Sequence, residues 1–120
     1  MKTIFVDGGA GTKPHYGYLL KETGKTKHVV SKTKITSNQA EYMAVLRALT
    51  DYQDSEDPIV IKSDSKIIVN QINHEWAINN EQLRKLAQQV WAMLGEMETK
   101  DITFIWVPRK ENLAGKMLGS

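Results

Sequence analysis

Residues 4–9 read Ile-Phe-Val-Asp-Gly-Gly, an apolar run that stops at an acid and two glycines. The stretch from Lys2 to Val6 is rich in β-branched and aromatic residues, which predicts a buried β-strand. Asp-Gly pairs are common in turns, so we expect this strand to stop at Asp7-Gly8-Gly9. The sequence thus places one carboxylate at the end of a buried strand.

Two further strands are expected directly after the first one. Apolar and small residues alternate from Tyr16 to Leu20, and Gly24 marks a turn into a polar, lysine-rich strand over residues 25–34. Three successive strands joined by short turns are typical of an antiparallel meander with one exposed face.

Beyond residue 36 the pattern changes to helices that alternate with strands. One helix is expected from about Asn38, with N-cap candidates at Thr36, Ser37 and Asn38 and apolar residues at Tyr42, Val45, Leu46 and Leu49. Strands are expected at 59–61 and 102–107, and helices at 66–73, from about 79 to 95, and at 112–118. Helices between strands imply crossover connections, hence an α/β fold with a mixed sheet covered on both faces.

Length and composition limit the class of protein. The chain has 120 residues, 41% of them hydrophobic and 25% charged, with a net charge of +2 and no cysteine. These values predict a single domain over residues 1–120. The lack of cysteine excludes disulfides and thiolate metal sites. No run approaches the ~18 apolar residues of a membrane span. We expect a monomeric, cytoplasmic protein without membrane contact.

Two more acids lie where an α/β sheet gathers its ligands, at strand ends. Asp64 follows the strand at 59–61, and Glu41 is expected in the first turn of the helix that begins near Asn38. Three carboxylates that converge on one sheet end repel each other unless a cation lies among them. Hard divalent ions such as Mg²⁺ prefer carboxylate oxygens, and pairs of them catalyse phosphodiester hydrolysis.

Each acid also has an explanation that needs no site. Asp7 is suited to a turn before two glycines. Asp64 is suited to capping the next helix, and Glu41 to compensating a helix dipole. The metal site is favoured by the three acids together rather than by any one of them.

In these residues the chain resembles type 1 ribonucleases H. The resemblance covers nearly the whole chain and lies in four segments, in the family's order: IFVDGG (4–9), TSNQAEYMAVLRAL (36–49), IVIKSDSKIIVNQI (59–72) and IWVPRKENLAGKMLG (105–119). It implies a ribonuclease H-like fold, a five-stranded mixed sheet in which three antiparallel strands precede parallel crossovers, with helices on both faces.

The resemblance also implies a reaction, hydrolysis of the RNA strand of an RNA/DNA hybrid by two-metal-ion catalysis with Mg²⁺ or Mn²⁺. Asp7 would bridge both ions, and Glu41 and Asp64 would hold the ion near the leaving group. The residues that it implies for hybrid binding are Thr36 at a DNA-strand phosphate, assisted by Asn79 or Asn80, and Ser37, Asn38, Lys66 and Asn70 at the minor groove.

The chain departs from the family pattern in three places. Gly115 stands where the pattern has a fourth carboxylate, which implies a weaker second ion and slower chemistry unless a water, Glu111 or Asn112 partly substitutes for it. Arg109 replaces a mobile histidine; it stays protonated and is suited to steadying phosphate charge. The stretch 74–83 is too short for the family's basic protrusion. Trp76 in this stretch is suited either to stacking on a DNA backbone sugar or to packing, and packing is favoured. We expect Trp106 to lie in the core.

Three functions remain open at this point. The first is a hybrid-specific endoribonuclease impaired by Gly115. The second is a non-catalytic hybrid-binding module on the same fold. A transposase-like or resolvase-like nuclease is less favoured, because such enzymes usually need further domains to dock DNA.

Overall fold

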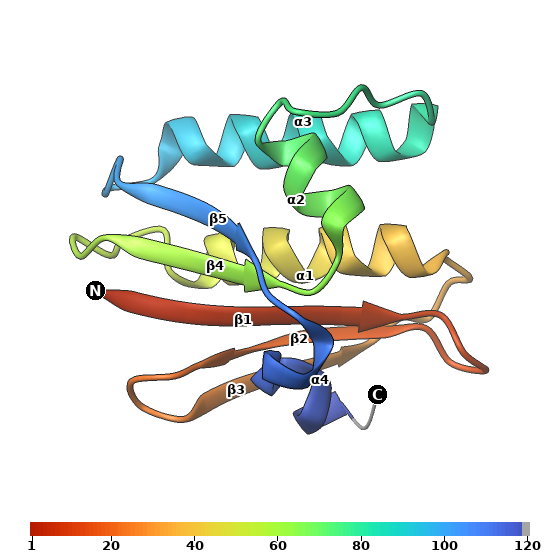
Figure 1. The fold of residues 1–120 in the computed structure, drawn as a ribbon, viewed down its shortest axis with the longest axis horizontal. Coiled ribbons are helices and arrows are strands. Elements are labelled where there is room, and N and C mark those ends of the chain that lie inside the picture. Colours follow the sequence, from red (N-terminus) through yellow and green to blue (C-terminus); the bar gives the residue numbers. More distant parts are fainter. Residues whose placement is uncertain (119–120) are drawn as a thin grey trace.

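The computed structural model describes residues 1–118 and folds them around one five-stranded sheet (Figure 1). The carboxyl-terminal end of the last resemblance segment, at residue 119, and the final residue of the expected domain lie outside this part. In chain order the elements are β1 (Lys2–Gly9), β2 (His15–Leu20), β3 (Lys25–Val30), α1 (Ser37–Asp51), β4 (Ile59–Ser63), α2 (Lys66–Ile72), α3 (Glu81–Glu96), β5 (Ile102–Trp106), the 3₁₀ turn η1 (Arg109–Glu111) and α4 (Leu113–Leu118).

The strand order across the sheet is β3-β2-β1-β4-β5. β1 and β2 pair antiparallel, as do β2 and β3, whereas β4 pairs parallel with both β1 and β5. This is the mixed sheet that the sequence predicts. β1 lies at its centre, between the antiparallel and the parallel half.

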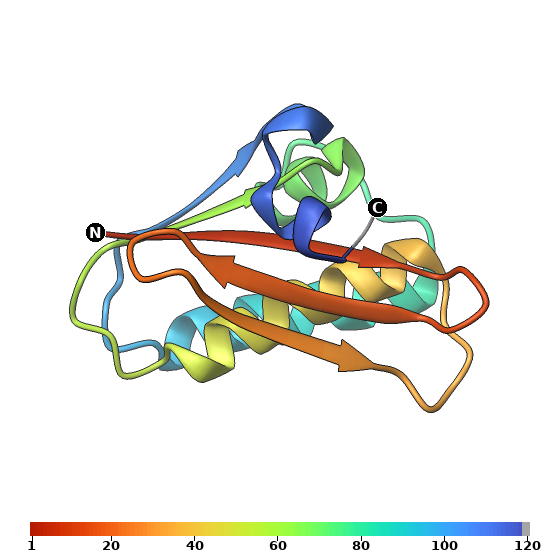
Figure 2. The same cartoon turned by 90° about the horizontal axis from the view of Figure 1, so that it is seen from below.

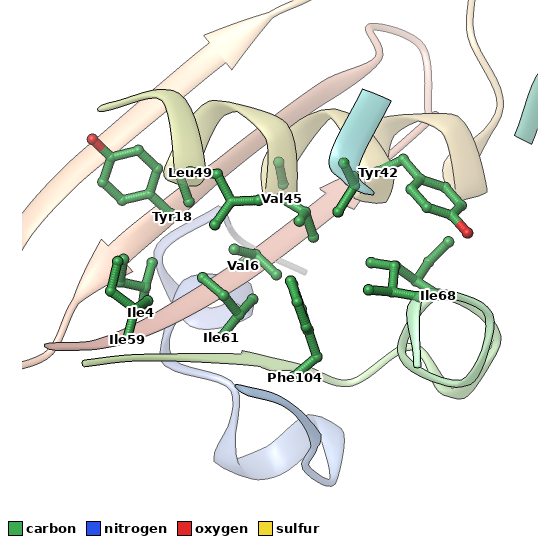
Figure 3. Close-up of a cluster of buried hydrophobic side chains, with 14 of the residues drawn as sticks. Ile4, Val6, Tyr18, Tyr42, Val45, Leu49, Ile59, Ile61, Ile68 and Phe104 are labelled. Atoms are coloured by element: carbon green, nitrogen blue, oxygen red, sulfur yellow. The ribbon is translucent and has the colours of Figure 1, made fainter. Parts of the chain in front are cut away.

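Helices cover both faces of the sheet. α1 and α3 lie together on one face, and the short α4 lies against β1 and β2 on the other (Figures 1 and 2). Alternation along β1 explains this arrangement, because successive side chains of a strand point to opposite faces. Ile4 and Val6 join Val45 and Leu49 of α1 in the main core (Figure 3), whereas Phe5 packs against Ala114 of α4.

β1 is longer than the sequence predicts. The expected turn at Asp7-Gly8-Gly9 is wrong: these residues continue the strand and pair with Gly17, Tyr16 and His15 of β2. The chain turns only after Gly9, because β2 supplies pairing partners up to that residue. Asp7 is therefore fixed inside a strand.

Four other expectations need correction. β3 ends at Val30, four residues before the predicted end, and β5 ends one residue early, at Trp106. α1 begins at Ser37, so Glu41 is its fifth residue and does not belong to the first turn. Trp106 is 39% exposed and Trp76 48%, so neither is a core residue.

Gly8 has a specific reason to lack a side chain. A Cβ at this position would lie 2.6 Å from the carbonyl carbon of Ala40 and 2.8 Å from the backbone nitrogen of Glu41. Gly8 thus lets the beginning of α1 pack directly on the end of β1. This close approach brings Glu41 over the strand that carries Asp7.

None of the helices described for residues 1–118 is both long and apolar enough to cross a membrane.

Candidate metal centre

Three carboxylates meet at one end of the sheet. Asp7 of β1, Glu41 of α1 and Asp64, which directly follows β4, each offer an oxygen atom, and these atoms lie within 4.8 Å of one another. Among the described residues this is the one group of three or more potential ligands with such spacing. The three acids that the sequence singles out are therefore neighbours in space.

Each carboxylate is delivered by a different element. Asp7 is 2% exposed, because it lies in the central strand between two paired neighbours. Asp64 occupies the bend between β4 and α2, where Ser65 rather than Asp64 caps the helix: the Ser65 hydroxyl accepts from the N–H of Ile68. The capping explanation of Asp64 is thereby excluded, and its carboxylate is left for the cluster.

Glu41 is the acid whose ionisation the site perturbs most clearly. The pKa of Glu41 is raised to about 7, mainly by burial and in addition by the nearby carboxylates of Asp7 and Asp64. A hydrogen bond with Ser65 and the charge of Arg109 act in the opposite direction. Burial and like charge both disfavour the ionised form, and a cation among the three acids would relieve both effects.

Asp64 is held from several directions. The amide nitrogen of Asn112 donates to Asp64 Oδ2 at 3.2 Å, and Arg109 Nη1 lies 3.7 Å from the same oxygen. The Asp64 side chain is 6% exposed and that of Arg109 is 60% exposed, so the guanidinium covers the cluster from the solvent side. The indole N–H of Trp106 donates to the backbone carbonyl of Asp64 at 3.0 Å.

Asn112 joins the site to the last helix. This fully buried side chain also donates to the carbonyl of Val6 at 2.9 Å, and its oxygen accepts from the N–H groups of Ala114 at 3.0 Å and Gly115 at 3.4 Å. Gly115 is itself buried in the first turn of α4. Having no side chain, it adds no ligand to the three carboxylates.

The donor set fits a hard divalent cation. Three carboxylate oxygens at this spacing match the oxygen preference of Mg²⁺, Mn²⁺ and Ca²⁺, and the set contains no nitrogen or sulfur ligand that would favour zinc. Mg²⁺ usually binds few protein oxygens and retains water molecules. Asp7, Glu41 and Asp64 are the residues that could hold such an ion.

The residues implied for hybrid binding lie on two helix N-termini and on α2. Thr36 caps α1 in a capping box with Gln39, and Asn80 caps α3 through the N–H of Leu83. The side chains of Gln39 and Gln82 share a hydrogen bond of 2.7 Å, which holds the two N-termini together. Both helices begin at the end of the sheet where β1 ends (Figure 1).

The remaining implied residues lie close to these elements. Ser37 and Asn38 form the first turn of α1. In α2, Lys66 is exposed, and the amide of Asn70 donates to the carbonyl of Lys66 at 2.8 Å.

Sequence patterns do not predict which residues hold the three carboxylates in place. Three residues contact Glu41 or Asp64: Ser65, Trp106 and Asn112. Of these, only Ser65 has a sequence pattern that predicts its position, because a serine directly before a helix is a typical N-cap. Trp106 is expected only as a core residue, and Asn112 only as a substitute for the missing ligand. Both contact Asp64 from elements that are distant in sequence, so no local pattern predicts these contacts.

The chain has recognisable relatives. Residues 15–119 match the model of the reverse transcriptase-like family. A bifunctional protein of Mycobacterium tuberculosis, Rv2228c, is 29% identical over 93% of this chain and 33% of its own length. The chain spans less than half of the length of the curated relatives that it matches first.

Solved structures agree with this match. Ribonuclease H1 of the archaeon Halobacterium salinarum superimposes with a TM-score of 0.85 at 26% identity, over 98% of this chain and 92% of that one. The LC11 ribonuclease H1 in complex with an RNA/DNA hybrid shares the fold, with a TM-score of 0.86 at 22% identity over 98% and 93% of the two chains. With its sheet order and its match over residues 15–119, the chain belongs to the reverse transcriptase-like family, within which it groups with the type 1 ribonucleases H.

Proposed function

We propose that this chain is an endoribonuclease that hydrolyses the RNA strand of RNA/DNA hybrids with Mg²⁺ or Mn²⁺. The observation that carries the proposal is the meeting of Asp7, Glu41 and Asp64, with ligand oxygens within 4.8 Å of one another. Membership of a nuclease family supports it, as does the fold shared with a protein solved in complex with an RNA/DNA hybrid.

In this proposal the three carboxylates hold the metal and orient the scissile phosphate beside it. A bound divalent cation supplies an activated water and neutralises charge on the phosphate. Arg109 lies at the solvent side of Asp64, where its permanent charge stabilises the extra negative charge of the transition state. Arginine stays protonated, so it takes no proton from the attacking water.

We further propose that the joined N-termini of α1 and α3 receive the DNA strand. Helix N-termini present unpaired N–H groups and a positive dipole end, which suit a phosphate. Thr36 and Asn80 cap these termini, and Ser37 and Asn38 follow Thr36 in the first turn of α1. Lys66 and Asn70 of α2 complete the proposed surface for the minor groove.

Gly115 favours a second candidate function, a hybrid-binding module with little or no turnover. The first turn of α4 lies next to Asn112, which contacts Asp64, yet position 115 contributes no carboxylate there. A missing ligand for one ion slows chemistry more than it weakens substrate binding.

A cleavage and binding assay separates the two candidates. Labelled RNA/DNA hybrid, single-stranded RNA and duplex DNA are incubated with Mg²⁺, Mn²⁺ or EDTA, using the wild type, Asp64→Asn and Asp54→Asn. Asp54 is an exposed acid at the opposite end of the sheet, so its variant is the matched control.

We expect metal-dependent cleavage of only the RNA strand of the hybrid, lost in Asp64→Asn and kept in Asp54→Asn. Hybrid binding without cleavage would support the binding module instead. Absence of both binding and cleavage would contradict both functions.

A further inference from the structure

Trp106 has an unusual position for a large aromatic side chain. It ends the edge strand β5, is 39% exposed, and pairs with Ser63, the residue before Asp64. Exposure of so large an apolar surface contributes little to folding, since apolar surface stabilises only when it leaves water. The presence of Trp106 at this position is therefore better explained by its contacts with the bend between β4 and α2.

The indole group contacts two residues of the bend between β4 and α2. Its N–H donates to the backbone carbonyl of Asp64 at 3.0 Å, and the ammonium group of Lys66 lies 4.7 Å from the ring centroid. Lys66 is the first residue of α2, directly after the capping residue Ser65. Trp106 thus contacts a candidate metal ligand through its N–H and a candidate minor-groove residue through its ring.

These contacts complement those on the carboxylate of Asp64. Asn112 and Arg109 act on the carboxylate oxygen, whereas Trp106 acts on the backbone carbonyl of the same residue. Asn112 and Arg109 restrict the carboxylate, and Trp106 restricts the main chain that carries it, so that together they keep the Asp64 carboxylate beside Asp7 and Glu41. Groups of this kind around a metal ligand commonly contribute tenfold or more to metal affinity.

We propose that Trp106 is a positioning residue of the hydrolytic site. Its N–H holds the main chain of Asp64 in place beneath the carboxylate, and its ring holds the Lys66 ammonium at the proposed minor-groove surface. This inference rests on the proposed function for the identity of the metal and of the nucleic acid that Lys66 contacts, but the contacts themselves do not depend on turnover.

Two substitutions distinguish the role of the indole N–H from the role of the ring. Trp106→Phe keeps a ring for Lys66 and removes the N–H, whereas Trp106→Leu removes both. Trp91→Phe is the matched control, because the indole N–H of Trp91 also donates to a backbone carbonyl, that of Ile72 at 3.1 Å, in an interaction that involves none of the three carboxylates.

The measurements are Mn²⁺ binding by the free protein, followed by electron paramagnetic resonance, and hybrid binding in EDTA. For Trp106→Phe we expect Mn²⁺ affinity to fall by roughly tenfold while hybrid affinity stays near that of the wild type. For Trp106→Leu we expect hybrid affinity to fall as well, by about two- to fivefold, as for loss of an exposed cation–π contact. Trp91→Phe should change neither affinity.

Unchanged Mn²⁺ affinity in Trp106→Phe would overturn the proposal, as would an equal loss in Trp91→Phe. A wild type without Asp64-dependent Mn²⁺ binding would overturn it as well. A wild type that binds Mn²⁺ and hybrid without cleaving would refute the proposed enzyme, whereas the positioning role of Trp106 would still be decided by the two affinities. Thermal melts of all variants distinguish loss of folding from loss of positioning.

Discussion

At the scale of single residues, the protonation of Glu41 couples the candidate site to stability. Its pKa rises from 4.5 to about 7 on folding, because burial and two neighbouring carboxylates disfavour the ionised form. In the absence of divalent cations, folded Glu41 therefore binds its proton more tightly than unfolded Glu41. This tighter proton binding stabilises the folded state in full below about pH 4.5, and the stabilisation is lost as the pH rises through 7.

The first prediction concerns Glu41→Gln in EDTA. Between pH 4.5 and pH 8 the wild type should lose about 3 kcal/mol of unfolding free energy relative to this variant, since each pKa unit corresponds to about 1.4 kcal/mol. Urea unfolding at both pH values measures the difference. Mg²⁺ at pH 8 should restore stability to the wild type more than to the variant. An equal pH response of the two proteins would contradict the burial of an ionisable Glu41.

A second prediction concerns the first turn of α4. Gly115→Asp should increase metal-dependent cleavage of the hybrid, by roughly tenfold or more if a ligand of the second ion is restored. Lys116→Asp is the neighbouring control, because position 116 is exposed and points about 100° away around the helix. An increase in cleavage in Lys116→Asp alone would indicate that the missing ligand belongs at position 116. No increase in either variant would favour the binding module.

At the scale of elements, the packing of α1 on β1 depends on Gly8. A Cβ there would lie 2.6–2.8 Å from the backbone of Ala40 and Glu41, a contact that only a shift of the helix relieves. Gly8→Ala should therefore destabilise the fold by about 1–3 kcal/mol and weaken Mn²⁺ binding by displacing Glu41. Denaturant unfolding and Mn²⁺ titration measure the two effects.

Gly95→Ala is the control for this third prediction. A Cβ at Gly95 meets nothing within 4 Å, and this residue lies in α3, where alanine favours the helix by about 1 kcal/mol. This variant should be equally or more stable, with Mn²⁺ affinity unchanged. A Gly8→Ala protein that behaves in the same way would show that α1 tolerates the side chain without moving.

Element type could be predicted from the sequence, but element ends could not. The order of strands and helices is confirmed, because hydrophobic periodicity reports which faces are buried. The continuation of β1 through Asp7-Gly8-Gly9 was missed, since it depends on the pairing offered by β2. Glu41 lies one residue further into α1 than expected, since the capping box at Thr36 starts the helix at Ser37 rather than at Asn38.

At the scale of the whole molecule, the candidate site is assembled from segments that lie far apart in the chain. The meeting of Asp7 and Asp64 could be foreseen, because the parallel strands β1 and β4 bring their ends to the same edge of a sheet. The contacts of Trp106 with Asp64 and Lys66 could not, because an edge strand and a central strand carry similar residue patterns. The role of Asn112 depends on α4 docking against β1, which no local pattern encodes.

The fourth prediction follows from the hydrogen bond between Asn112 and Val6, which spans 106 residues of the chain. Asn112→Ala leaves that carbonyl, and the N–H groups of Ala114 and Gly115, without this buried partner. We expect a loss of about 2–4 kcal/mol in unfolding free energy and weaker Mn²⁺ binding.

Asn73→Ala provides the comparison, because its side chain makes one bond to a backbone carbonyl, that of Phe104 at 3.1 Å. It should cost about 1 kcal/mol and leave Mn²⁺ binding intact. Chemical denaturation of both variants, with Mn²⁺ titration of the folded proteins, measures the difference. Equal effects would argue against Asn112 as the link between the site and α4.

The direction of β1 has a practical consequence. The strand begins next to the exposed Met1 at one end of the sheet and reaches Asp7 toward the other (Figure 1). A tether attached at the N-terminus would therefore emerge on the side away from the carboxylates and from the N-termini of α1 and α3. The protein could be immobilised on a bead or sensor chip through this end, with the proposed nucleic-acid face turned to the solution, so that single binding events are observed without obstruction by the support.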